Sequence, residues 1–161
     1  MAIKASNIGE NMIIGKILTA GVALSVLSVG ATAAVASAAP TSKTFTINAR
    51  GSNEMGKGDS MSTAYASGTI TVNTAKHNIC YEITTHDLKN ITMSHIHLGK
   101  KGTEGKVVVY LNVKAFNLKN MGHACVNVSA VVAKQIFSNP ANYYFNVHTE
   151  KYPNGAVRAQ L

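Results

Sequence analysis

The residues best suited to chemistry are three histidines: His95 and His97, which one residue separates, and His148 near the C-terminal end of the chain. In a β-strand, residues i and i+2 point to the same face with Cα atoms about 6.5 Å apart, so two such imidazoles can reach one ion. Copper and zinc sites use three or four nitrogen ligands at about 2.0–2.1 Å. Two interpretations stay open: the three rings bind a metal together, or each ring is structural and bonds to its own carbonyl or carboxylate.

The two cysteines, Cys80 and Cys125, lie in separate apolar segments. In an exported domain such a pair is expected to form a disulfide, which would stabilise the fold by about 4 kcal/mol through loss of chain entropy in the unfolded state. The alternative is a pair of buried free thiols. A thiolate metal site is the weakest interpretation, because neither cysteine belongs to a C-x-x-C motif.

Motifs for covalent or acid–base catalysis are not recognisable in the sequence. It has no G-x-S-x-G element, and only 7 of its 161 residues are Asp or Glu. A hydrolase that works by general acid–base catalysis would need carboxylates or a nucleophile in a defined pattern. We therefore assign no catalytic residues.

The histidines and cysteines are expected to lie on β-strands. Runs of β-branched and aromatic residues alternate with Gly, Asn, Asp and Lys at spacings of about ten residues, a pattern typical of an antiparallel sandwich or barrel. One stretch differs, in which Ser129 can cap a short helix that ends before Pro140. The expected strands are 43–50, 67–73, 78–86, 94–98, 106–113, 124–128, 143–149 and 156–161.

Alternation along these strands assigns side chains to faces. The residues expected in the core are Ile79, Tyr81, Ile83, Ile96, Leu98, Phe145 and Val147. The opposite faces then carry Cys80 and Glu82, the pair His95 and His97, and Tyr144, Asn146 and His148. All three candidate ligands thus lie on faces turned away from the core.

The N-terminal part of the chain indicates export. Residues 17–42 contain no charged side chain, Lys4 and Lys16 precede them, and small residues end the run near Ala38 and Ala39. This pattern predicts a signal peptide over residues 1–39, used by the general secretory route, and a single mature domain over 40–161 that is secreted or lies at the cell surface. The alternative is an uncleaved membrane anchor, because about 20 apolar residues can span a bilayer.

The chain is basic, with a formal net charge of +8 at pH 7. The densest basic run, Lys100 and Lys101 with Lys106, lies in a Gly-containing stretch without interleaved aromatic residues, which is typical of a solvated loop. It could attract an anionic cell-wall polymer or an extracellular protein through simple charge. Nothing in it indicates base or phosphate recognition, so we predict no nucleic-acid partner.

Several segments together resemble one known domain family. They are Phe45 with 49–54, the segments 94–99 and 105–109, and the segments 144–149 and 153–158, and they span nearly all of residues 43–161. In this order they are similar to the CHRD domain, named for chordin and common in exported microbial proteins. The resemblance implies an immunoglobulin-like antiparallel Greek-key sandwich or barrel with limited similarity to copper-zinc superoxide dismutase. It does not imply a particular activity.

The similarity to dismutases concerns four positions. Their copper ligands come from a His-x-His strand and a later Val-His strand followed by an anion-guiding arginine, and His95, His97, His148 and Arg158 stand in that order. The long zinc loop of dismutases has no counterpart, because residues 99–105 lead directly into the next strand. For Arg158 the more ordinary expectation is a surface cation paired with Glu82 or Glu150.

The sequence therefore supports two main functional hypotheses, beside a weaker third one in which the basic charge serves adhesion to the cell wall. The first is an exported, non-catalytic binding or structural module whose histidine rings each have a local partner. The second is a protein that binds copper or zinc through His95, His97 and His148, for which the three rings must converge on one point. A dismutase-like activity is the least supported form of the second hypothesis.

Overall fold

The computed structural model describes residues 38–161 except 56–62, 115 and 117–119. These residues form one compact unit, Ala38–Leu161. Among them, no helix combines the length and the apolar character needed to cross a bilayer. The predicted signal segment, residues 1–39, falls almost wholly outside the described residues, so its cleavage or anchoring stays a prediction.

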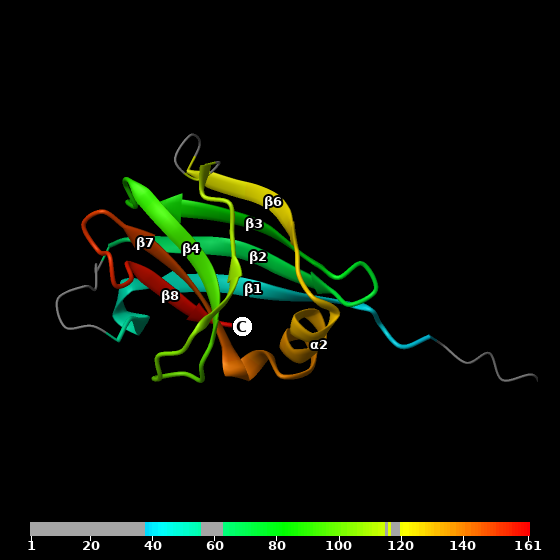
Figure 1. Cartoon of the computed structure of the whole chain (residues 1–161). Coiled ribbons are helices and arrows are strands. Elements are labelled where there is room, and N and C mark those ends of the chain that lie inside the picture. Colours follow the sequence, from blue (N-terminus) through cyan, green and yellow to red (C-terminus); the bar gives the residue numbers. More distant parts are fainter. Residues whose placement is uncertain (1–37, 56–62, 115, 117–119) are drawn as a thin grey trace, which may run out of the picture. The chain divides into compact units, whose positions relative to one another are not determined.

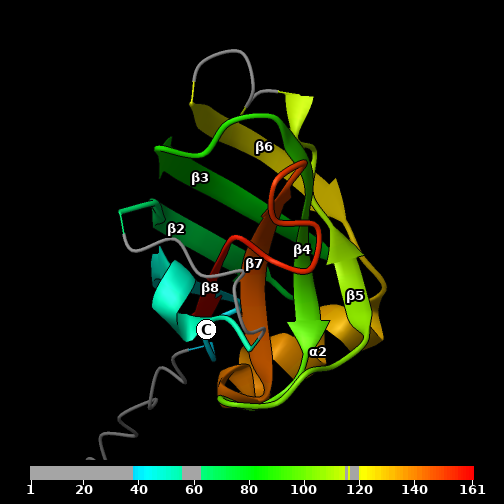
Figure 2. The same cartoon turned by 90° about the vertical axis from the view of Figure 1, so that its left-hand side faces the viewer.

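Eight strands form one antiparallel, nearly closed sheet in the order β5-β4-β7-β8-β1-β2-β3-β6. In Figure 2, β4, β5 and β7 make one wall, and β2, β3 and β6 cross behind it at an angle. This confirms the all-β antiparallel prediction. The strands are β1 (Ser42–Arg50), β2 (Tyr65–Asn73), β3 (Asn78–His86), β4 (Ile91–Leu98), β5 (Val107–Tyr110), β6 (Met121–Asn127), β7 (Tyr143–Thr149) and β8 (Val157–Gln160).

The predicted short helix is also present, as α2 (Ala130–Ser138) in the connection from β6 to β7. The side chain of Ser129 accepts a hydrogen bond from the backbone N–H of Val132, 3.2 Å away, and so caps the first turn. A short 3-10 turn, η2 (Pro140–Asn142), follows at once and leads into β7. Figure 1 shows α2 at one end of β1 and β2.

The strand β5 is shorter than the sequence predicts, because it ends at Tyr110 instead of Val113. The backbone of Asn112 bonds to the Tyr81 hydroxyl instead of to a neighbouring strand, with its N–H donating to that oxygen and its carbonyl accepting from it, both at 2.9 Å. The amide oxygen of Asn112 then accepts from the N–H of Lys114 at 3.1 Å. These side-chain bonds turn the chain out of the sheet.

The apolar faces of the strands meet inside the barrel. The predicted inward residues are buried, with one exception: Leu98, at the end of β4, is 38% exposed. The register between β4 and β5 shifts between Ile96 and His97, so simple alternation fails at this end of the strand. The largest fully buried side chains are Ile47, Ile70, Val72, Ile79, Tyr81, Ile83, Ile96, Phe116, Ile136, Phe145, Val147 and Val157.

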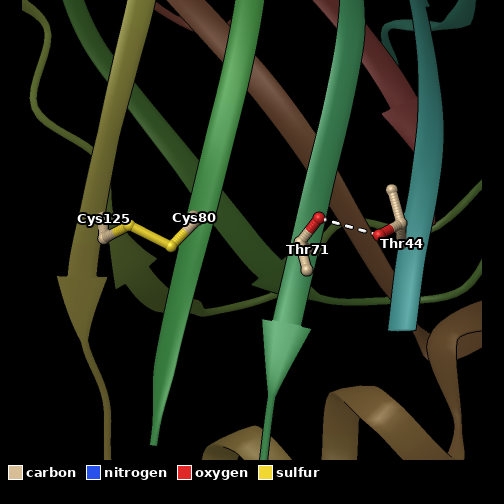
Figure 3. Close-up of a disulfide and its surroundings, with 4 residues drawn as sticks. All are labelled: Thr44, Thr71, Cys80 and Cys125. Carbon is tan, nitrogen blue, oxygen red and sulfur yellow. Dashed lines mark hydrogen bonds between the residues drawn. A yellow bond between two sulfur atoms is a disulfide. The ribbon is translucent and has the colours of Figure 1, made fainter. Parts of the chain in front are cut away.

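The predicted disulfide between Cys80 and Cys125 is present and links β3 to β6. The two cysteines stand directly opposite each other in the strand register, on the outer face of the sheet. Figure 3 shows them in the same region as Thr44 and Thr71, whose hydroxyl oxygens are 2.8 Å apart in a hydrogen bond between β1 and β2. On this face a covalent link therefore joins β3 to β6, and a polar side-chain link joins β1 to β2.

Candidate metal centre

Strand pairing brings the three predicted histidines together. In the register of β4 and β7, His95 lies opposite Asn146 and His97 lies opposite Tyr144, so His148 is diagonal to His95 on the same face. The ring centroids of His95 and His148 are 5.1 Å apart, and those of His95 and His97 are 5.4 Å apart. One ring nitrogen from each histidine lies within 4.8 Å of the other two. The rings therefore converge, as the metal hypothesis requires.

Hydrogen bonds fix the orientation of two of the rings. Nδ1 of His97 is 2.8 Å from the carbonyl oxygen of Gly105, and Nδ1 of His148 is 2.8 Å from the carbonyl oxygen of Pro153. Because a carbonyl oxygen can only accept, Nδ1 carries the proton in both rings and donates it. The lone pair of each ring is then on Nε2. A backbone carbonyl that holds Nδ1–H is a frequent outer partner of metal-binding histidine.

The remaining ring nitrogens have no hydrogen-bond partner among the described residues. Nε2 of His97, Nε2 of His148 and both ring nitrogens of His95 are buried and unbonded. The three side chains are only 4% to 9% exposed. Buried polar atoms without partners cost free energy, so such a cluster calls for a ligand. The structural interpretation required a local partner for every ring, and His95 has none on either nitrogen.

The spacing of these nitrogens suits a first-row transition metal. An ion bonded to imidazole nitrogens at 2.0–2.1 Å holds neighbouring nitrogens about 3.4 Å apart. The present separations of up to 4.8 Å exceed that value by at most about 1.4 Å, which rotations of the rings can supply. His95 is free to present either nitrogen, because no hydrogen bond holds its ring.

Burial keeps two of the three rings, His95 and His97, in the neutral form that binds metal. Desolvation, together with smaller contributions from the neighbouring His148 and His97, lowers the pKa of His95 to about 4. The pKa of His97 is also lowered, again mainly by burial, although its hydrogen bond to Gly105 acts in the opposite direction. A protonated imidazole has no lone pair to offer. At neutral pH both rings are thus available as ligands without loss of a proton.

The prediction that Arg158 is a surface cation paired with Glu82 or Glu150 is wrong. Arg158 is 3% exposed, and its Nη2 donates to the carbonyl oxygens of Lys100 and Thr103 at 3.2 and 2.7 Å. These carbonyls belong to the loop between β4 and β5, which curls over the outer face of β8. Arg158 is buried because that loop covers it, which strand alternation alone does not reveal.

A stack of side chains connects Arg158 to the histidines. Its guanidinium carbon lies 3.4 Å from the centre of the Tyr144 ring, within cation–π range. The His97 ring stacks on Tyr144 as well, with centroids 4.6 Å apart and planes 10° apart. The Tyr144 ring therefore packs between Arg158 and His97, so Arg158 supports the site through this ring.

Two further residues lie at the site although the sequence did not indicate a role for either of them. Asn146 is 3% exposed, and its Oδ1 has no hydrogen bond of regular geometry among the described residues. Its side chain nevertheless lies close enough to the His97 ring to act against the lowering of that ring's pKa. Tyr110 on the edge strand β5 is 69% exposed and packs edge-on against His95, with centroids 4.8 Å apart. Their position beside His95 follows from strand order, since β4 lies between β5 and β7. Only the strand order could have singled them out.

The other histidines do not join the cluster. His77 and His123 are exposed, and His86 is half-buried and stacks on Tyr65 with centroids 4.0 Å apart. The basic residues Lys100, Lys101 and Lys106 are exposed, in agreement with a solvated loop. The described residues that group as candidate metal ligands are thus the three predicted ones, His95, His97 and His148.

Comparison with known proteins gives a family but no characterised relative. No curated protein matches the chain, and no solved structure matches it. The model of the CHRD domain matches residues 45–161, which include β1 from Phe45 onward, the remaining strands and all three histidines of the cluster. The match covers most of the chain and agrees with the resemblance seen in its motifs. The chain therefore belongs to the CHRD domain family.

Proposed function

We propose that this protein is an exported, non-catalytic β-domain that binds one transition-metal ion, copper or zinc, through His95, His97 and His148. The observation that carries the proposal is the set of buried ring nitrogens without partners, all within 4.8 Å of one another. Fixed Nδ1 hydrogen bonds direct the lone pairs of two rings away from the protein backbone. Imidazole nitrogen is a preferred ligand of both metals.

Export is supported by the chemistry of the chain. The uncharged segment 17–42 has the composition of a signal peptide. The disulfide between Cys80 and Cys125 is compatible with an oxidising compartment outside the cytoplasm. In such a compartment a metal site made of histidines has an advantage over one made of thiols, because imidazole does not oxidise to a disulfide.

The surroundings of the site favour metal binding over turnover. The three histidines are nearly inaccessible, at 4% to 9% exposure, whereas a dismutase must admit its anionic substrate to the ion. The dismutase resemblance would assign Arg158 as an anion guide. Arg158 is itself buried, however, and its Nη2 donates hydrogen bonds to two backbone carbonyls. We therefore propose storage or delivery of the metal, with the dismutase resemblance limited to the order of the ligands.

A metal titration tests this function. The tag-free protein, stripped with a chelator, is titrated with Cu(II), Cu(I) under anaerobic conditions and Zn(II), followed by calorimetry and by analysis of bound metal. We expect one tight equivalent that is lost in His95→Ala and in His148→Ala. His123→Ala is the matched control, because His123 is an exposed strand histidine outside the cluster.

Two results would contradict the proposal. One is binding no tighter than the micromolar range, as scattered surface histidines give. The other is tight binding that His123→Ala reduces as much as His95→Ala does. In either case the cluster would be structural, and the role of the domain would have to be sought in a protein or polymer partner.

A further inference from the structure

One more side chain lies on the same face as the histidines. Met93 precedes His95 by two residues on β4, so the order along this face of the strand is Met93, His95, His97. In the register of β4 and β7, Met93 stands opposite His148, immediately after a register shift between Ile91 and Met93. Directly opposed residues on one face have Cβ atoms about 4.5–5.5 Å apart, within reach of a long side chain. Met93 is therefore a neighbour of two of the three ligands.

The exposure of Met93 distinguishes it from the histidines. It is 43% exposed, whereas His95 and His148 are 4% and 7% exposed. Met93 consequently forms the rim of the site, between solvent and the buried nitrogens. A methionine side chain is unbranched and adaptable, so it can swing between these two environments at small cost.

The chemistry of the thioether selects among metals. It is a soft, neutral donor that needs no deprotonation, and it favours Cu(I) over harder ions such as Zn(II). Imidazole alone discriminates poorly, because it suits copper and zinc alike. A sulfur atom at the rim of a three-nitrogen site thus changes which ion the site prefers more than it changes the affinity for metals in general.

We propose that Met93 is a fourth, soft ligand that makes the three-histidine site selective for copper and, above all, for Cu(I). The inference rests on the proposed function, since it requires the histidines to bind a metal. Met93 then has two roles. It makes the first contact with a copper ion that arrives at the rim, and it helps to retain Cu(I) once the imidazoles have bound the ion.

The test compares two conservative variants. Met93→Leu keeps an apolar side chain of similar size and removes the sulfur. Met121→Leu is the matched control, because Met121 is 44% exposed and lies on β6, which pairs with β3 and contributes no histidine to the cluster. The tag-free, disulfide-intact protein and both variants are compared for Cu(I) affinity by competition with a chromophoric chelator, and for Zn(II) affinity by calorimetry.

We expect Met93→Leu to weaken Cu(I) binding about ten-fold or more and to leave Zn(II) affinity unchanged within about two-fold. X-ray absorption of the Cu(I) form should show a sulfur scatterer in the wild type and in Met121→Leu, and none in Met93→Leu. Equal losses of Cu(I) and Zn(II) affinity would overturn the inference, as would an all-nitrogen copper shell in the wild type. Either result leaves the proposed function standing, whereas a wild type without a tight metal would remove both.

Discussion

Removal of the disulfide is the perturbation whose size follows most directly from the structure. Cys80 and Cys125 are 45 residues apart in the sequence. In the chain-entropy model, closing a loop of that length lowers the entropy of the unfolded state by an amount worth about 4 kcal/mol at 25 °C. For a domain of this size, each kcal/mol corresponds to about 3–4 °C in melting temperature. We therefore expect Cys80→Ser to melt about 10–15 °C below the oxidised wild type.

The assay is thermal unfolding followed by circular dichroism, with and without reductant. The wild type should lose the same 10–15 °C or so when reduced, whereas Cys80→Ser should hardly respond to reductant. The double variant Cys80→Ser with Cys125→Ser is the control for a stray thiol. A Cys80→Ser melting temperature within about 2 °C of the oxidised wild type would refute the argument, because it would mean that the cross-link does not restrict the unfolded chain.

Three further predictions concern the site and its cover. The depressed pKa of His95, about 4 in the folded chain against 6.5 for the free side chain, means that the unfolded chain binds the extra proton first as pH falls. Metal-free protein should lose up to about 3 kcal/mol between pH 7 and pH 4 in urea unfolding, and His95→Gln should flatten that profile. An equally steep profile in the variant would contradict the assignment. Arg158→Met should lower the free energy of unfolding in urea by about 2–4 kcal/mol, because the carbonyls of Lys100 and Thr103 lose a charged donor. A loss below about 0.5 kcal/mol would show that these bonds are not formed in solution. Tyr110→Ala should speed metal removal by a chelator without changing stability by more than about 1 kcal/mol, and an unchanged rate would mean that this ring does not cover His95.

Much of the fold could be predicted because hydrophobic alternation is strong in this chain. In β3 the apolar Ile79, Tyr81 and Ile83 alternate with polar neighbours, and all three are buried as expected. The helix α2 was predictable for a different reason, since Ser129 can cap it and Pro140 stops it. Strand ends were less certain. The end of β5 depends on Asn112 bonding to the Tyr81 hydroxyl, a contact between segments far apart in sequence.

The candidate site shows where sequence reasoning stops. Alternation placed His95 and His97 on the outer face, but it could not show that neighbouring loops bury them. The carbonyls of Gly105 and Pro153, which orient two of the rings, come from those loops. Whether His148 meets the pair depended on β4 and β7 being neighbours, which no local pattern reveals. The burial of Arg158 was missed for the same reason.

The central claim is that three imidazole nitrogens close on one ion, and histidine side-chain NMR tests it most directly. In metal-free, ¹⁵N-labelled protein, long-range proton–nitrogen spectra should show a proton on Nδ1 of both His97 and His148. One equivalent of diamagnetic Zn(II) should then shift Nε2 of both rings and one nitrogen of His95 together, with no further change beyond one equivalent. Unchanged histidine signals, or shifts at His77, His86 and His123 instead, would contradict the account.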